Sequence, residues 1–179
     1  WAVAAHAVRI FSPLALVMLL LCEDDPAKES RSAIFGEWIL RLAILATFAT
    51  HGAEAIGQNS AFIDLLIGSA NNLLRWDMSQ STAAVLLYII GAIDIVLAAT
   101  LLFKRWRWVA VYLAFWGFVT ASSRITEVGL AGMAETYPET LIRAANGGAP
   151  LALCILWVVL MSRQKAAIES LSKSHEESP

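Results

Sequence analysis

One stretch decides the fold of this chain: Thr82-Ala-Ala-Val-Leu-Leu-Tyr-Ile-Ile-Gly-Ala-Ile-Asp-Ile-Val-Leu-Ala-Ala-Thr-Leu-Leu-Phe103. It is almost entirely apolar, and an α-helix needs about 20 such residues to cross the hydrocarbon core of a bilayer. Lipid offers the backbone no hydrogen-bonding partner, so the stretch is predicted to be a transmembrane helix. Its one carboxylate, Asp94, lies near the middle, where a charge is most costly, and is expected to face protein.

The composition of the whole chain indicates a membrane protein. Hydrophobic residues make up 58% of the 179 residues and charged residues only 16%, whereas about a quarter of an ordinary soluble domain is charged. The formal net charge is only -2, and the basic residues are scattered rather than gathered into a patch. No role in nucleic-acid binding is therefore expected.

Hydrophobic stretches recur along the chain and predict an all-α, polytopic transmembrane helix bundle within residues 1–163. A polar tail, residues 164–179, follows the bundle. The five predicted spans are Ala2–Cys22, Ile34–Ile56, Thr82–Phe103, Trp106–Ser123 and Ala149–Ser162.

The turn Lys104-Arg105-Trp106-Arg107-Trp108 gives the strongest indication of orientation. Clustered Lys and Arg residues beside short loops stay on the cytoplasmic side of a membrane. Counting spans outward from this turn places the N-terminus outside and the C-terminus, with its polar tail, inside. The sequence thus predicts a multi-pass protein of the bacterial inner membrane.

Each of the two predicted outer loops carries a short amphipathic helix that is expected to lie on the membrane surface. In the first loop, Asn59 or Ser60 is expected to cap the helix. In the second loop, Pro138 is expected in the first turn of a helix. Asn146-Gly147-Gly148 is expected to end that helix before Pro150 starts the last span.

Two histidines lie at similar predicted depths near the outer surface, His6 in the first span and His51 in the second. Two neutral imidazoles on neighbouring helices can ligate a haem b, and Arg124 and Arg143 would then pair with its propionates. The alternative is close helix packing, with each histidine bonded to a backbone carbonyl or to a partner subunit. His51 also shares a helix face with Glu54, at a spacing that fits the binding of a proton, a metal or a polar head group. The structural alternative is a hydrogen bond or an ion pair with Arg124 or Arg143. His51, Glu54, Arg124 and Arg143 are predicted to converge at the outer surface.

Asp94 and the outer carboxylates Glu54 and Glu127 are predicted to be a structural polar cluster. Asp94 is expected either to be protonated and hydrogen-bonded or to meet a cation, Arg9 from the first span or Arg41 from the second. A proton relay or a contact with a quinone is the functional alternative to a structural clamp.

The chain carries little that indicates an enzyme. Cys22 and Cys154 lie at different predicted depths, so they are not expected to form a disulfide. The sequence has no Cys-x-x-Cys motif, phosphate-binding glycine loop, serine elbow or zincin motif. A stand-alone enzyme is therefore not expected, and no catalytic or metal site is assigned.

The segment from Arg41 to His51-Gly52, followed by an amphipathic outer segment and by Gly91-Ala-Ile-Asp94, resembles the DoxX-like family of small four-helix membrane proteins. The likeness covers about residues 34–162 and leaves the first span as an addition. Asp94 stands where that family usually has Glu, and Ala53-Glu54 replaces the basic residue that often follows the His-Gly pair. The family is linked to membrane redox systems, in one branch as a subunit of a quinone-reducing oxidoreductase. The resemblance therefore implies a redox-associated accessory role.

The function expected from the sequence is that of an accessory integral subunit of a larger bacterial redox or energy-converting membrane complex, in respiration or photosynthesis. Its role would be structural or docking, and its partners would be the lipid bilayer and other integral subunits. The aromatic residues of the fourth span are expected to present a flat face to such a partner or to lipid: Trp108, Tyr112, Phe115 and Phe118. Two alternatives stay open, a redox protein that binds haem b or a quinone and a transporter of protons or small solutes past Asp94.

Overall fold

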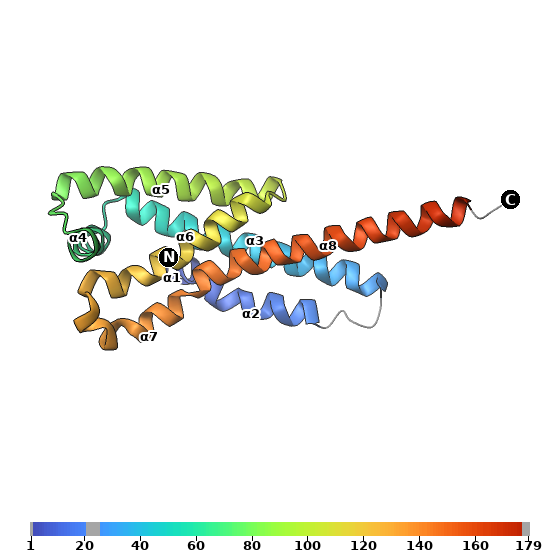
Figure 1. Ribbon diagram of the computed structural model, residues 1–179, viewed down its shortest axis with the longest axis horizontal. Helices are drawn as coiled ribbons and strands as arrows, with labels where there is room; N and C mark the ends of the chain where they lie inside the picture. The colour runs from blue at the N-terminus through green and yellow to red at the C-terminus, as the bar shows by residue number, and fades with distance from the viewer. Residues whose placement is uncertain (1, 21–25, 177–179) are drawn as a thin grey trace.

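The computed structural model describes residues 2–20 and 26–176, and the regular elements in these ranges are all helical (Figure 1). The all-α prediction is therefore confirmed. The elements are α1 (Ala2–Ala5), α2 (Ala7–Leu20), α3 (Pro26–Ile56), α4 (Ser60–Leu74), α5 (Gln80–Phe103), α6 (Arg107–Val128), the 3-10 helix η1 (Leu130–Gly132), α7 (Met133–Arg143) and α8 (Ala145–Glu176).

Within the described residues, four helical segments are long and apolar enough to cross a membrane: Arg31–Ile56, Gln80–Phe103, Arg107–Val128 and Met133–Lys165. They correspond to the second to fifth predicted spans, so the chain is a multi-pass membrane protein by helix length and hydropathy. The first predicted span differs, because the helix is interrupted at His6 and α2 has only 14 residues, whereas a straight span needs about 20. The predicted end of that span at Cys22 lies outside the described residues.

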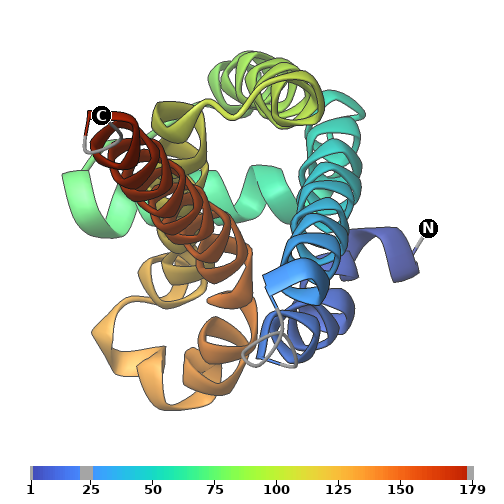
Figure 2. The same ribbon diagram turned by 90° about the vertical axis from the view of Figure 1, so that its right-hand side faces the viewer.

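The long helices run along one common axis, and the short helices α4 and α7 lie at the same end of the bundle (Figure 1). The end-on view shows α4 lying crosswise to the long helices (Figure 2). The turn between α5 and α6, at residues 104–106, lies at the opposite end. There α8 extends beyond the other helices, because it continues to Glu176 rather than ending near Ser162. The fold thus places both amphipathic helices at the end away from the basic turn.

The hydrophobic core lies where α2, α3, α5, α6 and α8 meet. Its fully buried side chains include Leu40 and Ile44 of α3, Leu101 of α5, Leu113 of α6 and Trp157 of α8. The outward faces of the long helices are also apolar, with exposed side chains such as Val85, Val96, Phe103, Trp108, Phe115 and Ile155. An apolar exterior of this extent fits a lipid environment rather than water.

Two close helix crossings position residues of the site described below. A Cβ atom on Gly52 of α3 would lie 2.7 Å from the carbonyl oxygen of Gly91 in α5. A Cβ atom on Gly117 of α6 would lie 2.5 Å from the carbonyl oxygen of Asn146 in α8. Such approaches require glycine, and small residues at crossings are how membrane helices pack closely. The crossings therefore fix the depth of His51, which adjoins Gly52, and of Asn146.

At the opposite end of the bundle, the buried carboxylate of Glu37 joins three elements. It accepts hydrogen bonds from Nε and Nη2 of Arg105, at 2.9 and 2.6 Å, and from Nε1 of Trp157 at 2.9 Å. Arg41, one turn further along α3, also donates to Glu37 and reaches the carbonyl oxygen of Leu102 at 3.1 Å. This network, which the sequence analysis did not predict, ties α3 to the α5–α6 turn and to α8.

The predictions for the outer loops have different outcomes. Asn59 caps α4 as predicted, because its Oδ1 accepts a hydrogen bond from the backbone N–H of Ala61 at 3.1 Å. In the second loop, α7 begins well before Pro138, which lies in the helix interior rather than in the first turn. Asn146-Gly147-Gly148 opens α8 instead of ending a helix. The glycines serve close packing there rather than a helix end, since a Cβ atom at Gly147 would lie 2.6 Å from the ring of Phe118 in α6.

Candidate functional site

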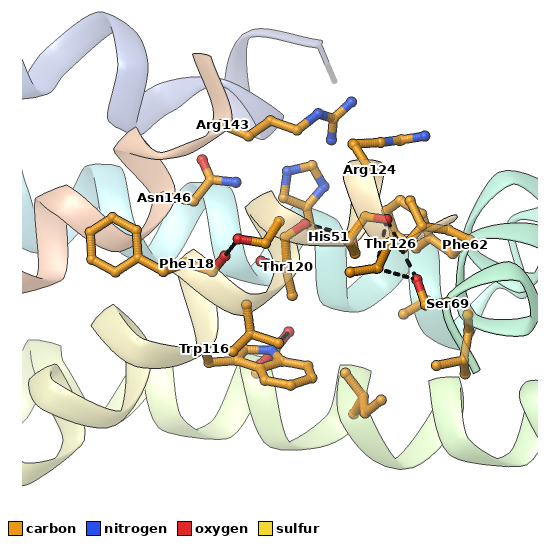
Figure 3. A pocket seen from close by; sticks show the side chains of 18 of the residues that line it. His51, Phe62, Ser69, Trp116, Phe118, Thr120, Arg124, Thr126, Arg143 and Asn146 are labelled. Carbon is orange, nitrogen blue, oxygen red and sulfur yellow. Dashed lines mark hydrogen bonds between the residues drawn. The ribbon is translucent and has the colours of Figure 1, made fainter. Parts of the chain in front are cut away.

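A cavity of about 480 Å³ lies at the end of the bundle that carries α4 (Figure 3). Side chains from α3, α4, α5 and α6 form most of its walls, and residues near the α7–α8 junction complete them. The lining is mainly apolar or aromatic and includes Phe48, Leu66, Leu87, Phe115 and Val119. The volume lies within the range of small-molecule sites, about 300–1,000 Å³.

His51 lines the cavity from α3 (Figure 3). Its Nδ1 lies 3.1 Å from Oε2 of Glu54, one helical turn further along. Its ring lies near that of Phe62 in α4, with 6.0 Å between the centroids. Its Nε2 is buried and has no hydrogen-bond partner among the described residues. A buried nitrogen in this state is unfavourable unless a ligand or a water molecule meets it.

Asp94 lines the cavity from α5 and is only 7% exposed, so it faces protein as the sequence predicted. Its Oδ2 accepts a hydrogen bond from the indole Nε1 of Trp116 in α6 at 3.3 Å. Its Oδ1 is buried and unpaired within the part of the chain that the structure describes. His51 and Asp94 thus each bring a buried polar atom without a hydrogen-bond partner to the cavity wall.

Neither cation predicted as an alternative partner of Asp94 is bonded to it. Arg41 donates to Glu37 near the basic turn. Nε and Nη2 of Arg9 in α2 are buried and have no hydrogen-bond partner among the described residues. The described structure therefore shows no ion pair for Asp94 and agrees with the hydrogen-bonded alternative, whereas the protonation of Asp94 stays a prediction.

Arg124 of α6 and Arg143 of α7 line the rim of the cavity, and their guanidinium groups lie close together above His51 in the view of Figure 3. Oε2 of Glu139 lies 3.9 Å from Arg124 and 3.8 Å from Arg143. Oε2 of Glu127 lies 3.6 Å from Arg124. These long, partly exposed ion pairs contribute little stability individually, but they balance the positive charge at the rim.

Helix α4 forms one wall of the cavity and is tied to α6 by polar side chains. Oγ of Ser69 lies 2.7 Å from Oγ1 of Thr126. Nδ2 of Asn72 donates to the carbonyl oxygen of Glu127 at 2.6 Å. Gly68 permits the close approach, because a Cβ atom there would lie 3.0 Å from the same carbonyl oxygen. The wall is thus held in place by a small residue and by hydrogen bonds.

The structure brings together most of the residues that were predicted to converge. His51, Arg124 and Arg143 all line the cavity, and Glu54 joins them through its contact with His51. His6 is not among the lining residues, because it lies at the interruption between α1 and α2 with an exposed side chain. The structure therefore does not place His6 and His51 as a pair of ligands.

The three carboxylates predicted as one polar cluster have separate partners. Glu54 bonds to His51, Glu127 pairs with Arg124, and Asp94 accepts from Trp116. Across the described residues, no group of three or more His, Cys, Asp or Glu side chains is placed to hold a metal ion. The polar groups of the site are therefore distributed around the cavity.

Asn146 is a residue of the site that the sequence analysis missed. It lines the cavity from the first turn of α8 and is 7% exposed. Its Oδ1 has no hydrogen-bond partner in the described ranges. The available signal was a polar side chain beside two glycines at the start of an apolar span, since the glycines let α6 approach closely enough to bury it.

No family model, curated protein or solved structure matches this chain. Function is therefore inferred from the fold and from the cavity. Together they define an integral membrane helix bundle with a mainly apolar, ligand-sized cavity that contains a few unpaired polar atoms.

Proposed function

We propose that the protein binds a lipophilic small molecule with a polar ring, of the quinone class, within the membrane. The observation that supports this most directly is the presence of two buried, unpaired atoms, His51 Nε2 and Asp94 Oδ1, in a mainly apolar cavity. Small-molecule sites commonly combine apolar walls with a few polar groups that orient the ligand. A quinone-class molecule suits such a site, because its ring carries two oxygens and its tail is hydrocarbon.

Some cavity-lining residues lie at the lipid-facing surface of the bundle, which supports entry of a ligand from the lipid. Leu73 of α4 and Phe115 and Val119 of α6 line the cavity and are also exposed at the surface of the bundle. The surrounding exposed faces are apolar, as in other lipid-facing helices. A molecule dissolved in the bilayer would therefore reach the cavity without passing through water.

The transporter alternative has less support. Toward the basic turn the bundle is filled by the fully buried side chains of Leu101, Leu113 and Trp157. The hydrogen-bonded Glu37 occupies the same end. A path for protons or solutes past Asp94 would have to cross this region, and protein interiors of this kind are closely packed.

The alternative of a haem b held by His6 and His51 also has less support. Axial ligation by two histidines requires both imidazoles to reach one iron. His6 is exposed at the interruption between α1 and α2, outside the cavity that His51 lines. His51 alone, with one unpaired ring nitrogen, is better suited to a hydrogen bond with a ligand than to the axial ligation of a haem iron by two histidines.

A second function, compatible with the first, is that of an accessory subunit of a redox or energy-converting complex in the bacterial inner membrane. It is favoured by the aromatic face of α6, whose members are all exposed: Trp108, Tyr112, Phe115 and Phe118. Aromatic side chains are enriched where protein subunits meet. The resemblance to DoxX-like proteins supports a partner of the redox type.

The test of ligand binding compares three forms of the protein purified from the native membrane in mild detergent. Thr120 lines the cavity, and its hydroxyl donates to the carbonyl oxygen of Gly117 at 3.1 Å, so Thr120→Phe fills the cavity with a ring. Thr100 is the matched control, because its hydroxyl donates in the same way to Leu97 at 2.7 Å and it is not among the cavity-lining residues.

Mass spectrometry of the extracted lipids provides the measurement. Thr120→Phe is expected to retain about tenfold less quinone-class lipid than the wild type, since overpacking removes the space for it. Thr100→Phe is expected to retain the wild-type amount. Equal amounts in all three proteins, or none in the wild type, would overturn the proposed function.

A further inference from the structure

We infer that the ligand of this cavity donates hydrogen bonds, so that the site takes the hydroxyl form of a quinone-class ring, the quinol, in preference to the carbonyl form. The inference rests on the proposed function and specifies the state of the ligand. It follows from the distribution of polar atoms, because the hydroxyl and indole donors in the cavity wall are used within the protein while several acceptors are left unpaired.

The hydroxyl groups that line the cavity all have acceptors within the protein. The interactions are Thr47 with Ala4, Thr120 with Gly117, Ser122 with Phe118, Ser123 with Thr120, Thr126 with Ser123, and Ser69 with Ser123 or Thr126. The indole N–H of Trp116 is likewise used, by Asp94. The charged donors, Arg124 and Arg143, lie at the rim in long ion pairs with Glu139, and Nε of Arg124 is the one donor there that is buried without a hydrogen-bond partner among the described residues. A ligand carbonyl deep in the cavity would therefore meet few free donors.

His51 supplies the first acceptor. A carboxylate can only accept hydrogen bonds, so the 3.1 Å contact between Nδ1 of His51 and Oε2 of Glu54 places a proton on Nδ1. In the neutral ring, which prevails for an ordinary histidine above about pH 6.5, Nε2 then carries a lone pair. This is the buried nitrogen that lacks a partner among the described residues. A ligand hydroxyl would donate to it.

Asp94 supplies the second acceptor. The indole of Trp116 occupies Oδ2, whereas Oδ1 is buried and unpaired within the described structure. When Asp94 is ionised, both of its oxygens only accept, and a ligand hydroxyl that donates to Oδ1 forms a charge-assisted hydrogen bond, which is stronger than a bond between neutral groups. A ligand carbonyl at the same position would bring two acceptors together. Asn146 Oδ1 is a further unpaired acceptor in the wall.

The two acceptors lie at different depths in the bundle. Gly52 and Gly91 face each other where α3 crosses α5. His51 precedes Gly52 by one residue, and Asp94 follows Gly91 by three. Because α3 and α5 run in opposite directions (Figure 1), both residues are displaced the same way from the crossing, and their backbones differ in depth by about 3 Å at about 1.5 Å per residue. A ring with two hydroxyl groups would offer one to each acceptor.

The experiment measures the binding of two redox-inert probes to the full-length protein in lipid nanodiscs by calorimetry. The probes are para-hexylphenol and its methyl ether, para-hexylanisole, which differ in the single hydrogen-bond donor. Empty nanodiscs give the reference for partitioning into lipid. The phenol is expected to bind about tenfold more tightly than the ether, since a hydrogen bond to an otherwise unpaired buried acceptor is worth about that much.

Variants test which residues produce the preference for the phenol over the ether. His51→Phe is expected to reduce the ratio of the two affinities, whereas His6→Phe, at an exposed histidine outside the cavity lining, is expected to preserve it. If His51→Phe fails to fold, Asp94→Asn provides the same test, because its amide offers the ligand a donor and should narrow or reverse the preference. If the variant that folds, His51→Phe or Asp94→Asn, keeps the wild-type ratio of phenol affinity to ether affinity, its residue is not an acceptor for the ligand.

The outcomes separate this inference from the function on which it rests. Equal affinities for the two probes, or tighter binding of the ether, would overturn the inference of a donor ligand while leaving a ligand-binding cavity in place. Binding of neither probe would overturn both, because the cavity would then not accept a lipophilic ring.

Discussion

At the scale of single residues, Glu37 and Asp94 are both buried carboxylates in membrane-spanning helices, but they are paired to different extents. Among the described residues, Glu37 accepts hydrogen bonds through both oxygens, from two arginines and from Trp157. Asp94 accepts through one oxygen, from Trp116, and its other oxygen remains unpaired beside the cavity. A fully paired buried charge has a structural role, whereas an unpaired atom beside a cavity marks a place for a ligand.

Removing the carboxylate of Glu37 should destabilise the bundle strongly. Glu37→Ala would leave the guanidinium of Arg41 and the indole of Trp157 buried without their acceptor, at a cost of about 3–5 kcal/mol in the free energy of unfolding. Glu169→Ala, in an exposed pair with Lys165 at 3.8 Å, is the control and should cost less than about 1 kcal/mol. Unfolding in detergent provides the measurement. If the two variants unfold alike, the network does not hold the helices together.

The effect of an Asp94 substitution on the free energy of unfolding should depend on whether an acceptor remains for the indole N–H of Trp116. Asp94→Leu would leave the indole N–H unpaired and is expected to lower the free energy of unfolding by about 1–3 kcal/mol. Asp94→Asn keeps an oxygen at this position and should remain close to the wild type. Thermal unfolding in the same lipid or detergent compares them. If Asp94→Asn were less stable than Asp94→Leu, the acceptor for Trp116 would not be what stabilises the protein at this position.

At the scale of helices, glycine crossings position the cavity. The contact between Gly52 and Gly91 joins α3 to α5, and the contact between Gly117 and the start of α8 joins α6 to α8. These crossings bring the backbones together next to cavity-lining residues, so that His51 and Asn146 are held by helices rather than by flexible loops. The site should therefore be sensitive to small increases in side-chain volume at the crossings.

The substitution Gly52→Ala should show this sensitivity. The added Cβ atom would lie 2.7 Å from the carbonyl oxygen of Gly91, so the helices must separate, at a cost of about 1–3 kcal/mol. Gly148→Ala is the matched control, because a Cβ atom there meets nothing within 4 Å in the described structure. It should be neutral or slightly stabilising, since alanine favours a helix over glycine by about 1 kcal/mol. Equal stabilities of the two variants in a thermal unfolding assay would contradict the close crossing.

Some helices could be predicted from the sequence and others could not, for physical reasons. The four long spans follow from hydropathy, because lipid imposes a minimum length of apolar helix. The start of α8 was mispredicted because Asn146-Gly147-Gly148 has the composition of a helix end, whereas in the structure it lies in the first turn of α8 and packs closely against α6. The interruption at His6 likewise left no hydropathy signal.

The candidate site was predictable in part. His51 and Glu54 could be paired from their spacing, because a helix places residues three apart on one face. The contact between Trp116 and Asp94 depends on how α5 and α6 pack, which spacing within one helix cannot show. The contact of Glu37 with Arg105 joins residues 68 positions apart, so it too depends on helix packing and could not be predicted from spacing.

At the scale of the whole molecule, the helices α4 and α7 lie at one end and the basic turn at the other. The positive-inside tendency then predicts that the cavity lies near the outer membrane surface, with the C-terminal end of α8 in the cytoplasm. Reporter fusions test this orientation. A fusion after Arg163 should give a cytoplasmic signal, and one within residues 71–77 should give a periplasmic signal. The opposite pair of signals would require the inverted orientation.

The central claim is that the cavity binds a lipophilic ring, and two tryptophans offer the most direct test. Trp116 donates to Asp94 inside the cavity, whereas Trp157 donates to Glu37 at the other end of the bundle. The measurement is the NMR titration of the indole N–H resonances with para-hexylphenol, assigned by Trp116→Phe and Trp157→Phe. The Trp116 resonance is expected to shift and saturate while the Trp157 resonance stays in place. An unchanged Trp116 resonance, or equal shifts at both sites, would contradict it.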